Sequence, residues 1–432
     1  MKTLLRLEWR HVRRDPAFWL ATFILAAALL YGLANGFAWT RFQAAARSQA
    51  ETLAADKLAA ARTDAAKFDA APPTNLNPNL DPRDARGFEF AYLRRFAVLP
   101  PAPAAALAVG QSDLLPLAIL VIAHGLLARE RDGGTLALLR AQPLSLARWL
   151  AARFLLRGGV VLGVFALTTV LGWLALGGAP SALGAVAAWL ALALAYGVFW
   201  FALAWWIGTR AATASSSALT LAGAWLVLVV LFPAGLNLTL KQLDPPPSRA
   251  AFQDSLRDGT DDAAHRGSQL LAQYLEDHPE LAPGSTPANE NDFFRTRFAV
   301  NAEIERLAAP LRAAFAAQLA RQQTVIERLR WFSPALVLHH GALTLAGTDR
   351  TRHQRWLDAV GDLHARTVDF FEPRLLRSAN FRDYDQVPTL DFRDPPASRA
   401  APFAALAALL LPAAALVALG TRVLRRSGFP TS

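Results

Sequence analysis

The longest stretch of the sequence without a charged residue or a histidine runs from Gly158 to Thr209, which is 52 residues. A helix needs only roughly 20 apolar residues to cross the hydrocarbon core of a bilayer. One spanning helix therefore cannot use the whole window. The glycines and the proline of the segment 177–181 interrupt it, so the pattern predicts two spanning helices joined by a tight hairpin.

Three further uncharged windows are each long enough for one spanning helix: Ala17–Trp39, Ala211–Leu240 and Ala400–Thr421. Trp19 and Trp39 lie near the two ends of the first window, where interfacial aromatic residues gather. That window is also longer than the apolar core of a signal peptide, which has about 7 to 15 residues. We therefore expect it to be an uncleaved membrane anchor.

A sixth span is expected in 110–128, although its uncharged part, Leu114–Ala128, has only fifteen residues. Two arrangements fit this segment. The helix either starts near Ala104 and carries Asp113 inside the membrane, or Ser112 and Asp113 cap a shorter helix at the interface. We favour the capped helix.

These windows predict an all-α integral membrane protein with six transmembrane helices and a mainly helical extracytoplasmic domain between spans five and six. In chain order the expected segments are an interfacial elbow helix (1–16), span one (17–39), an outer helical segment (40–109), span two (110–128), a cytoplasmic loop (129–153), span three (154–177), span four (182–207), span five (217–240), the outer helical domain (241–399), span six (401–421) and a cytoplasmic tail (422–432).

The distribution of charge orients the predicted spans. The segments assigned to the cytoplasmic side carry 15 basic and 4 acidic residues, whereas the other side is balanced, and the whole chain has a formal net charge of +10. Because positive residues collect in cytoplasmic loops, both termini are expected in the cytoplasm. The same distribution explains the high isoelectric point, so we expect membrane lipid and no nucleic acid as a partner. The preference for arginine and alanine is typical of a GC-rich bacterium, so the inner membrane is the expected location.

The outer segments are expected to be helical. Residues 41–71 are rich in alanine and contain no Gly or Pro, which predicts a helix that continues outward from span one until Pro72 and Pro73 end it. In the outer domain the apolar spacing is helical over 248–274, 289–332 and 350–371, with interruptions expected at Pro279, Pro283, Pro310 and Pro334.

Several kinds of chemistry are excluded by missing residues. The chain has no cysteine, so disulfides, thiolate metal sites and cysteine nucleophiles are impossible. The nucleotide-binding pattern G-x-x-x-x-G-K-[ST] needs a lysine after a glycine, and none of the four lysines has one before it. The protease and hydrolase patterns H-E-x-x-H and G-x-S-x-G are also absent. We expect no catalytic residue and no bound cofactor on this chain, and any ATP hydrolysis on a separate chain.

Two groups of polar residues need an explanation. The outer domain contains His339-His340 and, further on, His353, Asp358, Asp362 and His364. Adjacent histidines point to different faces of a helix, and carboxylates four residues apart are common on solvated helices, so we favour a solvated surface over a metal site. Within the membrane, Asp113 and His124 are the polar candidates, because ionisable groups retained there face the bundle interior. Their alternatives are a helix cap for Asp113 and a simple interhelical hydrogen bond for His124.

The loop after span two has the most distinctive local pattern. Gly133-Gly134 lets the chain turn away from the span, and Thr135 can cap a short helix that ends at Pro143. Leu136, Leu139 and Arg140 share one side of this helix. Such a short amphipathic helix either enters a groove on a partner protein or lies on lipid, and composition leaves both open.

The same loop resembles a known family. Glu130-Arg131-Asp132-x-Gly134-Thr135-Leu136, followed by Leu138-Leu139-x-x-x-Pro143, is similar to the E-R-E-x-G-T-L…L-L-x-x-P signature of type-2 ABC transporter permeases. Segments 110–114, 245–249, 333–335 and 346–348 are similar to a bacterial branch with a large helical insert before the last span. The departure is Gly133, since the family commonly has a polar residue after the acidic one, and it concerns only local loop shape.

The resemblance implies six spans, a dimeric permease and a separate ATPase that binds ATP and receives the cytoplasmic loop. The second permease subunit would be another copy of this chain or a paired sister. The implied ATPase-coupling residues are Glu130, Gly134, Thr135, Leu136, Leu139 and Pro143, and Leu4, Leu5, Trp9 and Val12 would form an interfacial elbow. The expected function is thus the permease subunit of an ATP-binding cassette transporter. The alternative is a membrane-anchored ligand-binding or sensory protein without transport activity.

Overall fold

The computed structural model is an all-α membrane protein, and the part of the chain that it describes contains no strand. That part comprises residues 2–70, 114–136, 145–175, 183–243, 249–281, 293–376, 383–393 and 400–426, together with Gly177, Gly178, Pro180 and Pro245. In these ranges five helices are long and apolar enough to cross a bilayer: Pro16–Lys67, Leu146–Ala175, Leu183–Arg210, Ala214–Leu243 and Pro402–Arg425.

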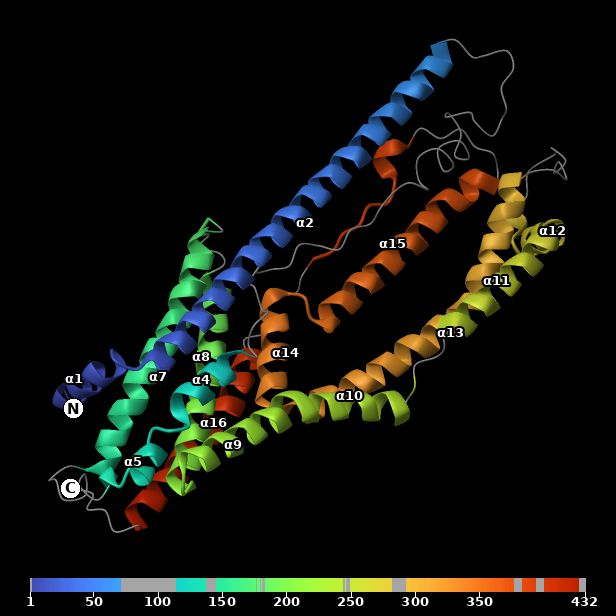
Figure 1. Ribbon diagram of the computed structural model, residues 1–432. Coiled ribbons are helices and arrows are strands. Elements are labelled where there is room, and N and C mark those ends of the chain that lie inside the picture. Colours follow the sequence, from blue (N-terminus) through green and yellow to red (C-terminus); the bar gives the residue numbers. More distant parts are fainter. Residues whose placement is uncertain are drawn as a thin grey trace.

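The N-terminal region consists of a short helix and a very long one. Helix α1 (Lys2–Val12) is followed by α2 (Pro16–Ala70), whose 55 residues correspond to about 80 Å of helix. Asp15 caps α2, because its Oδ1 accepts a hydrogen bond of 3.2 Å from the amide of Phe18. The apolar half of α2 packs in the bundle and its alanine-rich half projects beyond it (Figure 1). The predicted continuation of the first apolar helix beyond its apolar window is confirmed.

The bundle also contains α4 (Leu114–Ala123), α5 (Ala128–Asp132), α7 (Leu146–Ala175), α8 (Leu183–Arg210) and α16 (Ala400–Arg426). Helix α4 has only ten residues and is separated from α5 by a turn at 124–127, so the described part of the predicted second span is a short helix and a bend. Helix α7 begins at Leu146, inside the segment that the sequence assigned to the cytoplasmic loop. Its first turns therefore extend the bundle toward that loop.

The centre of the bundle is α8, which packs against α16, α14, α4 and α7. Leu192 and Tyr196 of α8 are fully buried. The next apolar helix is continuous but irregular: α9 (Ala214–Trp225) passes through a π-helical segment, η4 (Leu226–Leu231), into α10 (Phe232–Leu243). Most of this helix is exposed, which in a membrane leaves it to lipid or to another subunit.

The residues between the fifth and the last apolar helix form the helices α11 (Arg249–His265), α12 (Gly267–Asp277), η5 (Pro279–Leu281), α13 (Phe293–Leu329), η6 (Arg330–Phe332), α14 (Pro334–Ala346), α15 (Arg350–Leu376) and η7 (Tyr384–Gln386). Of these, α11, α12, α13 and α15 extend away from the bundle on the side toward which α2 projects (Figure 1). A small core forms where Ala61 and Ala65 of α2 meet Phe371, Leu375 and Tyr384.

One expected helix break is wrong. Helix α13 continues through Pro310 without interruption. A proline inside a helix removes one hydrogen bond and leaves the carbonyl four residues earlier without its usual donor. Both Pro310 and Arg306, the residue four positions earlier, are exposed, so water can hydrate that carbonyl. Pro279 and Pro334 do begin new elements, whereas Pro283 lies outside the described residues.

Helix α14 belongs to the outer domain by sequence but packs on the bundle helices α8 and α16. Its N-cap, Ser333, is fully buried and accepts a 3.2 Å hydrogen bond from the amide of Leu336. The same hydroxyl donates to the carbonyl of Leu228, in the π-helical segment, at 2.6 Å. A buried side chain thus joins the outer domain to the middle of the α9–α10 helix.

Candidate coupling site

A buried ion network joins the first helix to α7. The carboxylate of Glu8 on α1 is 5% exposed and accepts hydrogen bonds from two arginines one turn apart on α7. Arg153 Nε lies 3.0 Å from one carboxylate oxygen, and Arg157 Nε lies 3.1 Å from the other. Arg157 also donates to Asp15 at 2.9 Å. Because every charged group in the network has a partner, the desolvation cost of burying it is offset.

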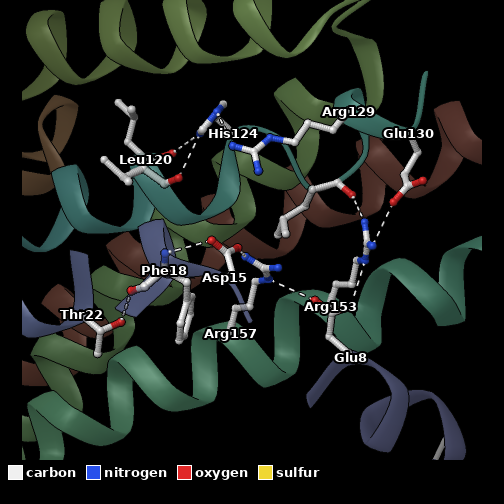
Figure 2. A network of polar contacts seen from close by, with 12 residues as sticks. Glu8, Asp15, Phe18, Thr22, Leu120, His124, Arg129, Glu130, Arg153 and Arg157 are labelled. Atoms are coloured by element: carbon white, nitrogen blue, oxygen red, sulfur yellow. Dashed lines mark hydrogen bonds and ion pairs between the residues drawn. The ribbon is translucent and has the colours of Figure 1, made fainter. Parts of the chain in front are cut away.

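The network continues into the loop through Arg153 (Figure 2). One of its terminal nitrogens lies 2.9 Å from the carboxylate of Glu130 on α5. Another donates at 2.8 Å to the carbonyl of Leu126, in the bend between α4 and α5. The guanidinium also lies over the ring of Trp149, 4.0 Å from its centroid. Arg153 therefore holds together α1, the α4–α5 bend, α5 and its own helix.

Three consecutive residues of the loop contact three different helices. Glu130 pairs with α7 as above, and Arg131 donates at 2.9 Å to the carbonyl of Thr209 near the end of α8, and to that of Ala211 just beyond it. Asp132 accepts a 2.8 Å hydrogen bond from the amide of Ala214, the first residue of α9. The triplet is thus attached to α7, to the end of α8 and to the start of α9.

The position of Asp15 perturbs its ionisation. Burial acts to raise its pKa, but the hydrogen bonds from Arg157 and from the amide of Phe18 outweigh burial, so the pKa of the Asp15 carboxyl lies below its usual value. Asp15 is therefore a stable anion that connects the start of α2 to α7.

The glycine pair allows the turn that follows α5. Gly134 has a φ of +69°, a conformation that side chains with a Cβ adopt rarely. The hydroxyl of the next residue, Thr135, donates to the carboxylate of Glu130 and lies 3.3 Å from its carbonyl oxygen. Leu136 is partly buried against the bundle core. Leu139 and Pro143, like Asp113 further back, lie outside the described residues.

His124 lies where α4 ends. Its Nδ1 is 3.1 Å from the carbonyl of Leu120 and 3.0 Å from that of Val121. With Nδ1 as the donor to these carbonyls, Nε2 lies 3.5 Å from the guanidinium of Arg129 and can accept from it. The ring therefore satisfies backbone carbonyls at the bend, and Arg129 is its side-chain neighbour.

A small pocket of about 110 Å³ opens beside the network, between the start of α2, the α4–α5 bend and α7. Its polar lining comes from Asp15, Arg129, Glu130, Arg153 and Arg157, and its apolar lining includes Phe18, Val121, Ile122 and Leu126. It contains carboxylates and guanidinium groups but no nucleophile or metal-ligand set. In the described part of the chain as a whole, no three His, Asp or Glu side chains gather in a way that could hold a metal ion.

Sequence reasoning missed the residues that anchor the loop. Glu8, Asp15, Arg153 and Arg157 entered it only as charges that set the orientation, although they form one network. The available signal was the spacing of Arg153 and Arg157, which places two cations on one face of a helix, next to an apolar window. Their partners could not be identified, because they lie more than 140 positions away.

Comparison with known proteins gives two findings. Residues 249–393 match the family model described as "Domain of unknown function (DUF3526)". The chain is also 34% identical over 146 residues to the "Probable ABC transporter permease protein NosY" of Pseudomonas aeruginosa. The chain is similar, over part of its length, to an ABC transporter permease.

The aligned region is 32% of this chain and about half, 52%, of that protein. No solved structure matches. The similarity and the apolar helices support a multi-pass membrane protein.

Proposed function

We propose that this chain is the membrane-spanning permease subunit of an ABC transporter in a bacterial inner membrane, with both termini in the cytoplasm. A separate ATPase subunit binds ATP and docks on the loop that begins at Arg129. This chain carries no catalytic residue and acts mechanically. A second permease subunit, either another copy or a sister chain, completes the transporter.

The observation that carries this proposal is the attachment of the Glu130-Arg131-Asp132 triplet to α7, α8 and α9. A loop that only lay on lipid would need no such attachment. A loop that receives force from an ATPase needs rigid connections to the helices it moves, because a partner shifts an equilibrium only through contacts that differ between its states. The partial similarity to a permease supports the same function.

The helices that the ATPase is proposed to move also contact the outer domain. Helix α9 leads into the π-helical segment, where Leu228 receives the hydrogen bond from Ser333 of the outer domain. π-Helical segments inside α-helices are frequent at functional sites. We therefore place the substrate-receiving or gating role in the outer domain, with α14 as its link to the helices that the ATPase moves.

Purification from native membranes in mild detergent, followed by mass spectrometry of the proteins that remain bound, tests this function. We expect an ATPase with a nucleotide-binding motif to co-purify with the wild type and to be lost from the double variant Leu136→Asp, Leu139→Asp. The matched control is Leu53→Asp with Leu307→Asp, which makes the same change at exposed leucines of α2 and α13. The control is expected to retain the ATPase.

The result that would contradict the proposal is a folded wild type from which no ATPase is recovered. That outcome would favour the membrane-anchored ligand-binding or sensory protein. Loss of the ATPase from both double variants would show that the effect is not specific to the loop. Size-exclusion chromatography of each variant distinguishes loss of binding from loss of folding.

A further inference from the structure

The pocket beside the ion network contains one cation that the network does not use. Arg153 and Arg157 are paired with the carboxylates of Glu8, Asp15 and Glu130. Arg129 forms no ion pair with a carboxylate among the described residues; its guanidinium lies 3.5 Å from Nε2 of His124, and its charge also acts on the nearby carboxylate of Asp15. The pocket therefore presents a guanidinium group without an ion pair of its own, beside carboxylates that are already paired with Arg153 and Arg157.

The side chain of Arg129 packs over Gly125, where the lack of a Cβ leaves room for it. A Cβ added at Gly125 would lie 2.5 Å from Arg129 Nε, so Arg129 lies directly over this glycine. Arg129 is itself exposed and Gly125 is buried. The guanidinium group is thus accessible from outside but has a fixed place in the wall of the pocket.

Exposed apolar side chains occur in the pocket wall and at the start of α2, and the segment that precedes Asp15 in the chain is basic. Val121 lines the pocket and is 45% exposed, and Trp19 and Leu20 at the start of α2 are 39% and 61% exposed. Helix α1 and the turn after it carry five cations that form no ion pair with a carboxylate in the described part of the chain: Lys2, Arg6, Arg10, Arg13 and Arg14. This combination marks the boundary between hydrocarbon and water on the membrane face that carries α1.

We propose that the mouth of this pocket binds the headgroup of an anionic phospholipid, with Arg129 on the phosphate and the acyl chains along the apolar surface of α2 and α4. An arginine fork matches phosphate oxygens in a bidentate arrangement. The basic residues of α1 raise the local concentration of anionic lipid. A free phosphate would gain nothing from Val121, Trp19 and Leu20, whereas a lipid uses both these apolar side chains and the guanidinium group.

The lipid site does not require the proposed ATPase coupling, but Arg129 is also the first residue of the loop on which the ATPase is proposed to dock, so lipid retention and ATPase binding are measured separately. The full chain is equilibrated in mixed micelles that contain phosphatidylglycerol and phosphatidylcholine with the same acyl chains, and native mass spectrometry counts the lipids that stay bound during delipidation. We expect the wild type to retain phosphatidylglycerol in preference to phosphatidylcholine. Arg129→Gln should reduce this preference about tenfold, the effect of losing one charge-assisted contact. Arg129→Lys should keep part of the preference.

The matched control is Arg148→Gln, which removes an exposed arginine near the start of α7 outside the pocket and should leave the preference unchanged. Equal retention by the wild type and Arg129→Gln would overturn the proposal. An equal loss in Arg148→Gln would do so too, because it would show that only diffuse surface charge matters. If Arg129→Gln released a co-purified ATPase while lipid retention stayed the same, Arg129 would be a protein contact and not a lipid site.

Discussion

Within the ion network, Glu8 is the carboxylate that pairs with both arginines of α7. It is 4% exposed and neutralises two arginines that have little access to water. Glu8→Ala leaves these cations short of a carboxylate, and breaking a buried ion pair costs about 3 kcal/mol of stability. We expect a lower melting temperature in detergent, measured by tryptophan fluorescence. Glu51→Ala, at an exposed position on α2, should melt like the wild type. Indistinguishable melting of all three proteins would show that the network does not stabilise the fold.

The ionisation of Asp15 predicts a dependence of stability on pH. Because its pKa is lower in the folded protein than the ordinary value of 3.8, the unfolded state binds the proton more readily. The stabilisation is therefore complete well above pH 3.8 and is lost as the pH falls from there through the lowered folded-state pKa. Asp15→Asn cannot titrate, so its stability should fall less steeply than that of the wild type over this range. Parallel acid-denaturation curves for the two proteins would contradict this assignment.

Sequence reasoning identified the loop residues but not their contacts. Glu130, Gly134 and Thr135 were predicted to form an ATPase-coupling element from their resemblance to a family signature, and that role remains a prediction. The contacts of Arg131 and Asp132 with the helix ends near Thr209 and Ala214 come from the tertiary fold. A charge pattern shows which side of the membrane a residue faces, but it does not show which of several nearby charges will be its partner.

At the scale of elements, the packing of α14 on α8 can be tested at Gly341 of α14, with Gly361 of α15 as a comparison. A Cβ at Gly341 would lie 2.6 Å from Cδ2 of Leu192, which is fully buried, so this side chain would have to shift within the bundle core. Gly341→Ala should therefore destabilise the protein by about 1–3 kcal/mol through overpacking. Gly361, in α15, has no atom within 4 Å of the added Cβ, so Gly361→Ala should stabilise it by about 0.5–1 kcal/mol. Thermal melts that shift in the same direction would show that α14 does not pack tightly on α8.

The elements that the sequence predicted well are those governed by local properties. The outward half of α2 followed from alanine content and the absence of Gly and Pro, and the all-α membrane fold followed from the uncharged windows. Pro310 gave a wrong prediction, because the cost of a proline in a helix depends on whether the freed carbonyl reaches water. The packing of α14 against the bundle could not be predicted from the sequence either. Its thirteen residues are too few to span a membrane, and their apolar pattern does not distinguish an outer core from the flank of a bundle.

At the scale of the whole molecule, the buried apolar residues fall into separate clusters. One large cluster fills the bundle, and two small ones hold the outer domain together. Local stability follows the number of buried apolar contacts, so the outer domain should open more readily than the bundle. The long helix α2 belongs to both regions, because Phe18 and Leu25 lie in the large cluster and Ala61 and Ala65 in a small one.

The separation of the bundle core from the small outer clusters can be tested at Ala65. The residue is 2% exposed in the small cluster that contains Phe371 and Leu375. Ala65→Glu places a carboxylate in this apolar contact, which should release the outer half of α2 while the bundle stays folded. Hydrogen-exchange mass spectrometry should show faster exchange in α15 and the outer part of α2, with unchanged protection in α8. Ala66→Glu makes the same change at an exposed neighbour and should exchange like the wild type. If α8 also lost protection in Ala65→Glu, the outer domain and the bundle would unfold as one cooperative unit, and α2 would be part of a single core.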